Sequence, residues 1–256
     1  METTQPQTRT FEFIAPSGHS YTIREQNGED DDILSNPVRA KTLQNLSDFA
    51  SGLIVTNTRN SGRLTSDEIQ ELPALDRYVI LFNSRVFSIG KDVDFEFDWG
   101  KENGGIAQYE VDLNDFLFDY SSVPTEEVLN SKPNAVPFYP APEKEKGIEI
   151  NLTSGKVVSF DLLSGTGETY MVSLPIKTKN SELKARNLKL SVQGKFEVVE
   201  NFRLFSVKDM MEIRAKVNEY DPIFAGQTDI ENPHKSDQKT IINVVAIPGF
   251  FYPGEI

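Results

Sequence analysis

The amino-acid sequence predicts an α+β fold of two similar subdomains, each a β-hairpin with helices packed on a short antiparallel sheet. Three observations lead to this class. Apolar and polar residues alternate near the N-terminus, the stretch from Leu64 to Gly90 carries the strongest helix signals of the chain, and the hairpin pattern returns in the second half. We expect an N-terminal domain at 1–122, a proline-rich linker at 123–146 and a C-terminal domain at 147–256.

The first predicted element is a hairpin around Ser17-Gly18. Phe11 and Phe13 alternate with other residues before the turn, and Tyr21 and Ile23 do so after it. This period of two is typical of strands with one buried face.

Helices are predicted to follow. Residues 37–55 place apolar side chains at helical spacing. Thr65 and Glu68 have the spacing of a capping box, with Leu64 and Ile69 as its hydrophobic staple. Pro73 should end this short helix, because it lacks an N–H donor. A second helix is expected from about Pro73 to Phe87, where one face is apolar and Gly90 follows as a stop signal.

Two strands are predicted next, at 92–97 and 106–113, since aromatic and aliphatic residues again alternate with acidic ones. The amino-acid composition then changes. Residues 123–146 hold prolines at positions 124, 133, 137, 140 and 142 and end in a charged run. A long segment of this composition favours a partly extended connection between domains.

The opening hairpin recurs at a constant offset of 137 residues, which places Ile148 where Phe11 stands and Ser154-Gly155 where Ser17-Gly18 stand. A helix is predicted at 206–220 and a strand at 240–247. Two explanations stay open at this point. One is an internal duplication, and the other is chance similarity between two amphipathic hairpins.

The composition limits the possible functions. The formal net charge is −13, from 39 acidic and 26 basic residues, and no basic patch is visible, so nucleic-acid binding is not expected. The absence of cysteine excludes disulfides, thiol nucleophiles and cysteine-ligated metals. The N-terminus lacks the pattern of a signal peptide, and no apolar run approaches the length of a membrane span. We expect a soluble, intracellularly made protein with no membrane partner.

No catalytic, cofactor-binding or metal-binding constellation is predicted. His19 and His234 each stand alone, there is no Gly-x-Ser-x-Gly, and the acidic run at 29–32 lacks the ligand spacing of a calcium loop. The segment Ser164-Gly-Thr-Gly is interpreted as a β-turn, because no lysine of a phosphate-binding loop follows it. Carboxylates are abundant, so a carboxylate-dependent hydrolase stays open as an alternative.

Exposed aromatic residues are the remaining signal. The C-terminal segment carries Phe250, Phe251 and Tyr252 between two Pro/Gly pairs, and the linker carries Phe138 and Tyr139. Aromatic side chains are enriched where protein interfaces are strong, so these five are the predicted partner-binding residues. The alternative is that Phe250 and Phe251 dock back on their own domain. On the first interpretation, deletion of 248–256 should weaken partner binding without unfolding the chain.

Three segments together resemble a known family. They are Pro16-Ser17-Gly18 followed by Tyr21–Arg24, the helix and its stop at Leu75–Gly90, and the strand end Tyr109–Leu113. Over residues 11–118 the pattern is similar to the T-even-like hub subunits and hub assembly chaperones of contractile-tailed bacteriophage baseplates. Some relatives carry cysteines that suggest a zinc clip after the helix, but Phe97–Gly100 has none, so that metal is not expected here.

The resemblance implies a non-enzymatic protein that helps to assemble the baseplate hub through contacts with other phage baseplate or tail proteins. A chaperone of this kind would offer apolar surface to a hub protein and would act in the host cytoplasm during assembly. The alternative within the same family is a permanent structural subunit of the virion baseplate or tail.

Overall fold

The computed structural model describes residues 9–141 and 144–251, and it confirms the predicted α+β class. The first part of the chain contains, in order, β1 (Thr10–Ile14), β2 (Ser20–Arg24), α1 (Gly28–Leu34), α2 (Pro37–Ala40), α3 (Gln44–Leu53), β3 (Ile54–Asn57), α4 (Ser66–Gln70), α5 (Ala74–Ser88), β4 (Asp92–Asp98) and β5 (Ile106–Asp112). The second contains α6 (Glu126–Ser131), β6 (Ile148–Asn151), β7 (Val157–Phe160), α7 (Gly165–Ser173), α8 (Lys179–Ala185), β8 (Lys189–Val192), β9 (Lys195–Val198), α9 (Val207–Tyr220), β10 (Gln227–Asn232), β11 (Lys235–Asn243) and α10 (Pro248–Phe251).

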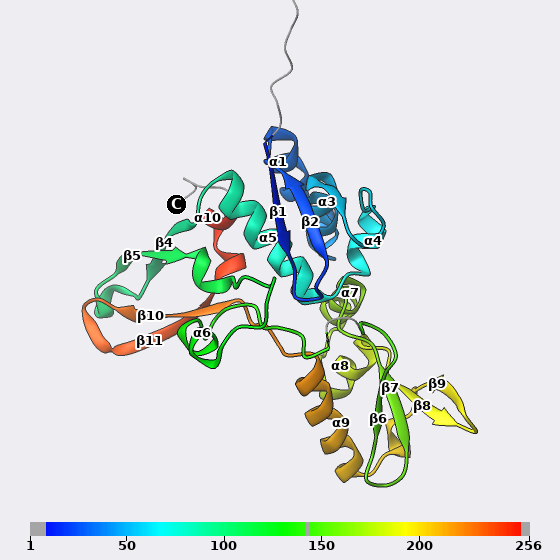
Figure 1. Ribbon diagram of the computed structural model, residues 1–256. Coiled ribbons are helices and arrows are strands. Elements are labelled where there is room, and N and C mark those ends of the chain that lie inside the picture. Colours follow the sequence, from blue (N-terminus) through cyan, green and yellow to red (C-terminus); the bar gives the residue numbers. More distant parts are fainter. Residues whose placement is uncertain (1–8, 142–143, 252–256) are drawn as a thin grey trace, which may run out of the picture.

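All strand pairs in the described residues are antiparallel, and they form four small sheets. One sheet has the order β1-β2-β3, a second has the order β6-β7-β8-β9, and the hairpins β4-β5 and β10-β11 form the other two. Figure 1 shows the first sheet beside α3, α4 and α5, and the four-stranded sheet lower down beside α8 and α9.

Helix α5 is the central element of the molecule, as the strength of its sequence signals indicated. Residues from this helix enter each of three clusters of buried apolar side chains: Val79 lies in one, Ile80 in the next and Phe82 in the third. In Figure 1 the helix runs between the β1–β2 hairpin and the β4–β5 hairpin. A helix that is apolar on several sides can be covered by sheets on both flanks.

The predicted start signals of this region are confirmed. The Thr65 hydroxyl accepts from the Glu68 N–H (3.3 Å), and the Glu68 carboxylate accepts from the Thr65 N–H (2.8 Å), which completes the capping box. Leu64 and Ile69 are both buried in one cluster, and Pro73 separates α4 from α5.

The helix predicted at 37–55 is wrong in two places. Leu43 has a left-handed backbone (φ 58°), which separates α2 from α3. At Ile54 the chain leaves the helix and forms β3, where Ile54 pairs with Ile23 of β2. The strand predicted at 240–247 ends at Asn243, because the Asn243 side chain accepts from the Val245 N–H and starts a 3₁₀ turn.

The interpretation of Ser164-Gly-Thr-Gly as a β-turn is also wrong. The Ser164 hydroxyl accepts from the Gly167 N–H (3.3 Å) and caps helix α7. Because glycine has a low helix propensity, the start of α7 was not recognised in the sequence. The glycines are required by packing, because a Cβ on Gly165 would collide with Arg77 and one on Gly167 would lie 2.6 Å from the Ala185 carbonyl oxygen.

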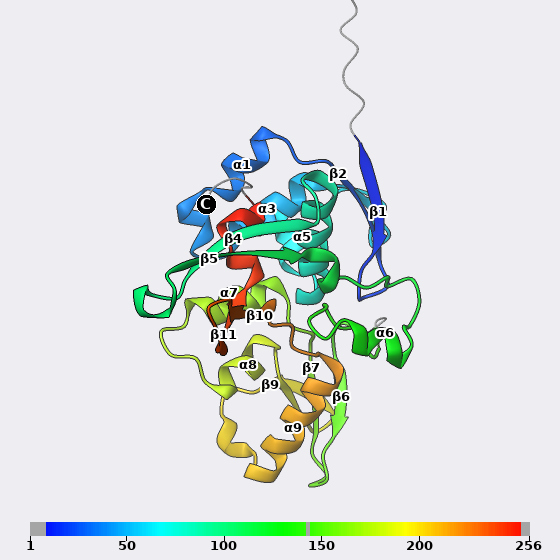
Figure 2. The same cartoon turned by 90° about the vertical axis from the view of Figure 1, so that its left-hand side faces the viewer.

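The predicted recurrence has a structural counterpart. Each hairpin is followed by a helix, α1 or α7, and the N-caps of these helices, Asn27 and Ser164, are also 137 residues apart. In each half a later strand pairs with the second strand of the hairpin: β3 with β2, and β8 with β7. The predicted domain boundaries stay a prediction, but contacts cross them. Val136 and Tyr139 of the predicted linker are buried with residues of α5. Helix α10 lies beside β4 (Figure 2), and Ile230 of β10 is buried in one cluster with Val93 of β4 and Val111 of β5.

Candidate functional site

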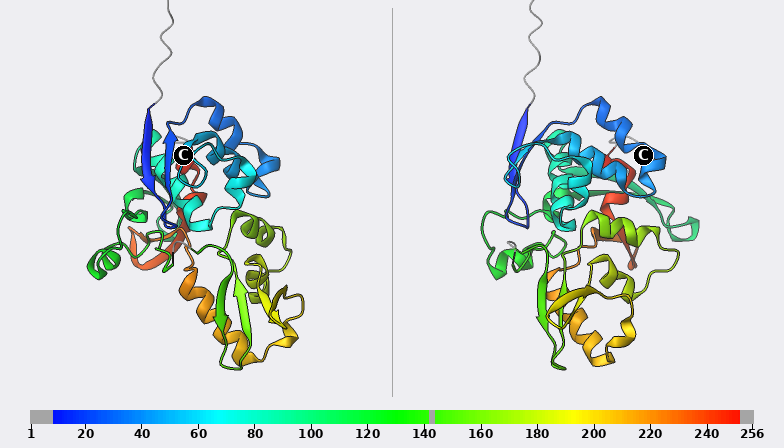
Figure 3. Two further views of the ribbon diagram at one scale, coloured as in Figure 1. Left: turned by 45° about the vertical axis from the view of Figure 1, so that its right-hand side comes forward. Right: turned by 90° about the vertical axis from the view of Figure 1, so that its right-hand side faces the viewer.

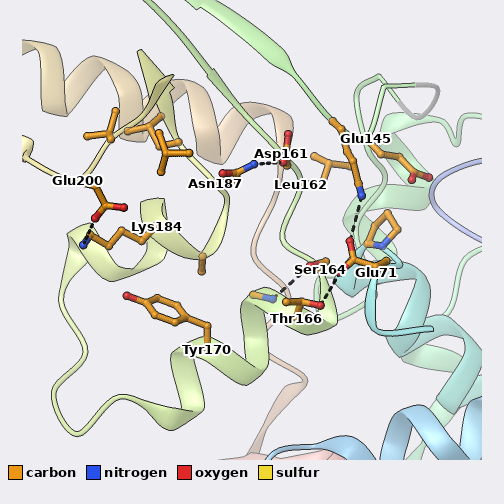
Figure 4. A pocket seen from close by; sticks show the side chains of 17 residues that line it. Glu71, Glu145, Asp161, Leu162, Ser164, Thr166, Tyr170, Lys184, Asn187 and Glu200 are labelled. Carbon is orange, nitrogen blue, oxygen red and sulfur yellow. Dashed lines mark hydrogen bonds and ion pairs between the residues drawn. The ribbon is translucent and has the colours of Figure 1, made fainter. Parts of the chain in front are cut away.

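A groove of about 580 Å³ lies between the α4–α5 corner and the unit formed by α7, α8 and the end of β9 (Figure 4). Its apolar lining includes Leu162, Leu188 and Val199, all of them buried. The polar residues that line it are Glu71, Glu145, Lys146, Asp161, Ser164, Thr166, Tyr170, Lys184, Asn187 and Glu200. A concave site with an apolar floor and a polar rim is the usual form of a binding site.

One end of the groove is formed by Glu71, at the C-terminus of α4. Its carboxylate accepts from the Thr166 hydroxyl (2.8 Å) and from the Lys146 ammonium (3.1 Å). The hydrogen bond from Thr166, followed by the bond and charge of Lys146, lowers the pKa of Glu71 below its usual value. Glu71 is therefore an ionised group whose partners come from two other segments.

The other end is more open. Lys184 of α8 and Glu200 after β9 form an ion pair (3.5 Å), and Figure 4 shows the Tyr170 ring at this same end. Tyr170 and Val198 are exposed while they line the groove. Exposed apolar and aromatic groups beside a hollow mark a site for another molecule more often than scattered surface residues do.

A buried cluster around Asp76 holds the segment that supplies Glu145 and Lys146. Asp76 has an exposure of 0% and accepts from the Ser17 hydroxyl (2.5 Å), the Ser17 N–H (3.0 Å) and the Tyr21 hydroxyl (3.2 Å). Arg59 donates to Asp76 (3.3 Å) and also binds Glu145 with both of its terminal nitrogens. The groove edge is thus attached to the first sheet.

Burial has a clear electrostatic consequence in this cluster. It raises the pKa of Asp76 to about 6, although the bonds from Ser17 and the charge of Arg59 act in the opposite direction. Because Asp76 is fully buried and does not line the groove, this carboxyl is a structural group.

A second buried pair fixes α7 against α5. Arg77 of α5 forms an ion pair with Glu168 of α7, and Arg77 also donates to the Ser47 hydroxyl (3.3 Å). The Tyr78 hydroxyl donates to the same carboxylate (3.3 Å), and burial raises the pKa of Glu168. These contacts hold the helix that carries Thr166 and Tyr170, so they set the width of the groove.

The groove is suited to binding by charge and apolar contact. Its lining carboxylates outnumber its lysines four to two, and both lysines are paired with them. Asp161 accepts from the Asn187 side chain (2.9 Å) and from the Gly147 N–H (2.8 Å). No group of three or more His, Asp or Glu residues that could hold a metal ion occurs in the described ranges. The hydrolase alternative stays a prediction.

The predicted partner-binding residues lie elsewhere. Phe250 has an exposure of 0% and packs edge-to-face on Phe82, with 5.3 Å between the ring centroids. Phe251 is half-buried and contacts Phe49 in the same manner (6.0 Å). The structure therefore shows the alternative, docking of both rings on their own chain. Tyr252 lies outside the described residues.

The linker pair is also packed inside the chain. Tyr139 is buried, and its hydroxyl accepts from the Leu75 N–H (3.3 Å). Phe138 is half-buried against Tyr120, with ring centroids 4.8 Å apart. These two residues belong to a different apolar cluster from Phe250. Partner contact at all five positions stays a prediction. Phe250 and Tyr139 are buried, so a partner could reach them only if the chain opened around them.

The groove was not predicted from the sequence, because its residues come from five separate segments, at 71–73, 145–146, 161–170, 184–188 and 198–200. The available signal was the pair of glycines in Ser164-Gly-Thr-Gly, which marks a close approach of another segment as well as a turn.

Comparisons with family models, with curated proteins and with solved structures returned no match to this chain. In the part of the chain that the structure describes, no helix is both long and apolar enough to cross a membrane.

Proposed function

We propose that this protein is an assembly factor of a phage baseplate hub and that it holds an extended segment of a baseplate or tail protein in the groove between α4 and α7. The observation that carries the proposal is the groove itself, which combines an apolar floor with a charged rim supplied by both halves of the chain. The sequence resemblance supplies the biological setting.

The groove chemistry defines the segment that fits it. An apolar side chain of the partner would cover Leu162, Leu188 and Val199. Lysine or arginine on either side of it would pair with Glu71 at one end and Glu200 at the other, in place of Lys146 and Lys184. The net charge of −13 favours the approach of such a basic segment.

A chaperone role follows from reversible binding. A partner segment held in this groove is unavailable for self-association until a later component displaces it. The ion pairs Glu71–Lys146 and Glu200–Lys184 of the free protein re-form after the partner is released. Their formation lowers the free-energy cost of losing the partner. A permanent subunit would use the same surface and would differ only in retention.

The test compares two substitutions in the same helix. Tyr170→Asp changes a groove residue, whereas Val172→Asp places the same charge at an exposed position that does not line the groove. Tagged full-length protein is expressed in phage-infected cells, cross-linked and purified, and the baseplate and tail proteins recovered with it are quantified by mass spectrometry. We expect at least a tenfold loss of recovery for Tyr170→Asp and none for Val172→Asp, with equal thermal stability.

Two outcomes would overturn the proposal: equal recovery for both variants, or no phage protein recovered with the wild-type chain. Mass spectrometry of purified particles then separates the two roles. Abundance in the lysate with absence from the particle supports an assembly factor, and stoichiometric presence in the particle identifies a permanent subunit.

A further inference from the structure

Strand β9 forms an open edge of the four-stranded sheet. The sheet has the order β6-β7-β8-β9, and no strand in the described ranges pairs with β9 on its outer side. All four of its residues, Lys195 to Val198, are exposed. Figures 1 and 3 show the β8–β9 hairpin projecting from the body of the molecule. An exposed edge strand is a template for pairing with another chain.

The backbone groups that face this edge follow from the register. The Val199 N–H donates to the Leu188 carbonyl (2.9 Å), and hydrogen-bonded pairs alternate along an antiparallel ladder. In the observed register, Glu197 and Lys195 therefore bond to β8, opposite Leu190 and Val192. The N–H and C=O groups of Phe196 and Val198 point away from β8 and toward the open edge.

The turn supports the same assignment. Gln193 and Gly194 have φ values of 51° and 80°, as a two-residue type I′ turn requires. In such a hairpin the residues that flank the turn, Val192 and Lys195, exchange both hydrogen bonds. Phe196 is then the first residue whose backbone is free to bond outward.

The side chains of β9 complement a second copy of themselves. If two β9 strands pair antiparallel about Phe196, Lys195 of each faces Glu197 of the other, and the two Phe196 residues face each other. Phe196 would form a hydrogen-bonded pair, and Lys195 and Glu197 would form the closer, non-bonded pairs. No ion pair within the described residues uses Lys195 or Glu197.

We propose that β9 pairs with β9 of a second copy of this chain, centred on Phe196, to give a continuous eight-stranded sheet. The charge pattern favours a second copy as the occupant. Charged residues that only prevent pairing at an edge need not be complementary to the same strand of another copy, whereas Lys195 and Glu197 are. A four-residue edge is small for an interface, so the dimer is expected to be weak, with a dissociation constant on the order of micromolar. The proposal is independent of the groove.

The test uses charge reversal in the full chain. Sedimentation velocity is measured from about 1 to 200 μM at 0.15 M salt, where the Debye length of about 8 Å reduces repulsion between whole chains. The wild type should dimerise with concentration. Lys195→Glu and Glu197→Lys should each dimerise about tenfold more weakly, since each places like charges opposite each other twice.

The decisive sample is an equimolar mixture of the two variants. A chain with two glutamates then faces a chain with two lysines. With one variant ¹⁵N-labelled so that the masses differ, native mass spectrometry should show the mixed dimer well above the share that random pairing gives. A wild type that stays monomeric throughout the concentration range would overturn the proposal, and so would a mixture that associates no better than its components. If β9 pairs with a strand of a different protein instead, the mixture of the two variants should associate no better than its components.

A cross-link checks the register without relying on charge. The natural chain has no cysteine, so Phe196→Cys introduces the only thiol. The Cα atoms of an antiparallel hydrogen-bonded pair lie about 5.5 Å apart, within the range that a disulfide spans. Mild oxidation should give a covalent dimer, whereas Val207→Cys, at an exposed position outside the edge, should not. Equal cross-linking of both variants would contradict the register.

Discussion

Gly18 and Gly155 stand 137 residues apart and close the same turn. Their φ values are 81° and 83°, and each donates its N–H three residues back, to Ala15 (2.8 Å) and to Leu152 (2.9 Å). Ala15 and Leu152 in turn donate to the carbonyls of His19 and Lys156. The two hairpins are built on one plan, so equivalent residues of the two halves provide matched controls.

The first prediction uses such a pair, Gly28 and Gly165, which follow the helix caps. Gly165→Ala should lower the free energy of unfolding by about 1–3 kcal/mol, because its Cβ would collide with the buried Arg77 guanidinium. Gly28→Ala should be neutral or stabilising by up to about 1 kcal/mol, since nothing lies within 4 Å of its added Cβ. Urea unfolding measures both values. Equal effects would mean that α7 does not pack on Arg77 in solution.

The second prediction concerns the C-terminal helix. Phe250→Ala should cost about 3–5 kcal/mol, because the ring is buried among Phe82 and its neighbours. Phe11→Ala, at a ring that is 40% exposed, should cost less than half as much. Thermal or urea unfolding gives the comparison. Deletion of 248–256 should likewise destabilise the chain, in contrast to the expectation from the sequence. Comparable losses for the two phenylalanines would show that α10 is not part of the core.

The third prediction is a pH dependence at Asp76. Burial raises its pKa to about 6 from 3.8, so the folded state binds this proton more tightly than the unfolded state. Its contribution to stability is full below pH 3.8 and is lost as the pH rises through about 6. The wild-type free energy of unfolding minus that of Asp76→Asn should fall by as much as ~3 kcal/mol between pH 4 and 7.

The control for this measurement is Asp67→Asn, which removes one negative charge at an exposed position of α4 and so reports the effect of charge loss without burial. A difference that grows with pH, instead of falling, would mean that the bonds from Ser17 and the charge of Arg59 outweigh burial.

The fourth prediction concerns Arg59, which joins Asp76 to Glu145. Arg59→Leu should cost about 3–5 kcal/mol at pH 7, because the Asp76 carboxylate loses its cationic partner inside the core. The double variant Arg59→Leu/Asp76→Asn should recover part of this loss, since no buried charge is left unpaired. A double-mutant cycle of unfolding free energies measures the coupling, and strictly additive losses would argue against the ion pair.

Local signals in the sequence were sufficient for several elements. The capping box at Thr65, the helix after Pro73 and the alternation in β4 and β5 depend on residues within a few positions of one another, and all were predicted. Strand β3 was missed because its pairing with β2 joins residues more than thirty positions apart. Helix α7 was missed because its glycines are required by close packing against Arg77 and Ala185, which are distant in the sequence.

The fold class, the central helix with its start and stop, and the turn that both hairpins share could all be predicted from local sequence. Each depends on side-chain periodicity or backbone conformation over a short stretch. The packed structure was needed to show that Phe250 is a core residue, that five distant segments line one groove, and that β9 lies at an open edge. These features are set by which surfaces meet, and burial is a property of the whole packed chain.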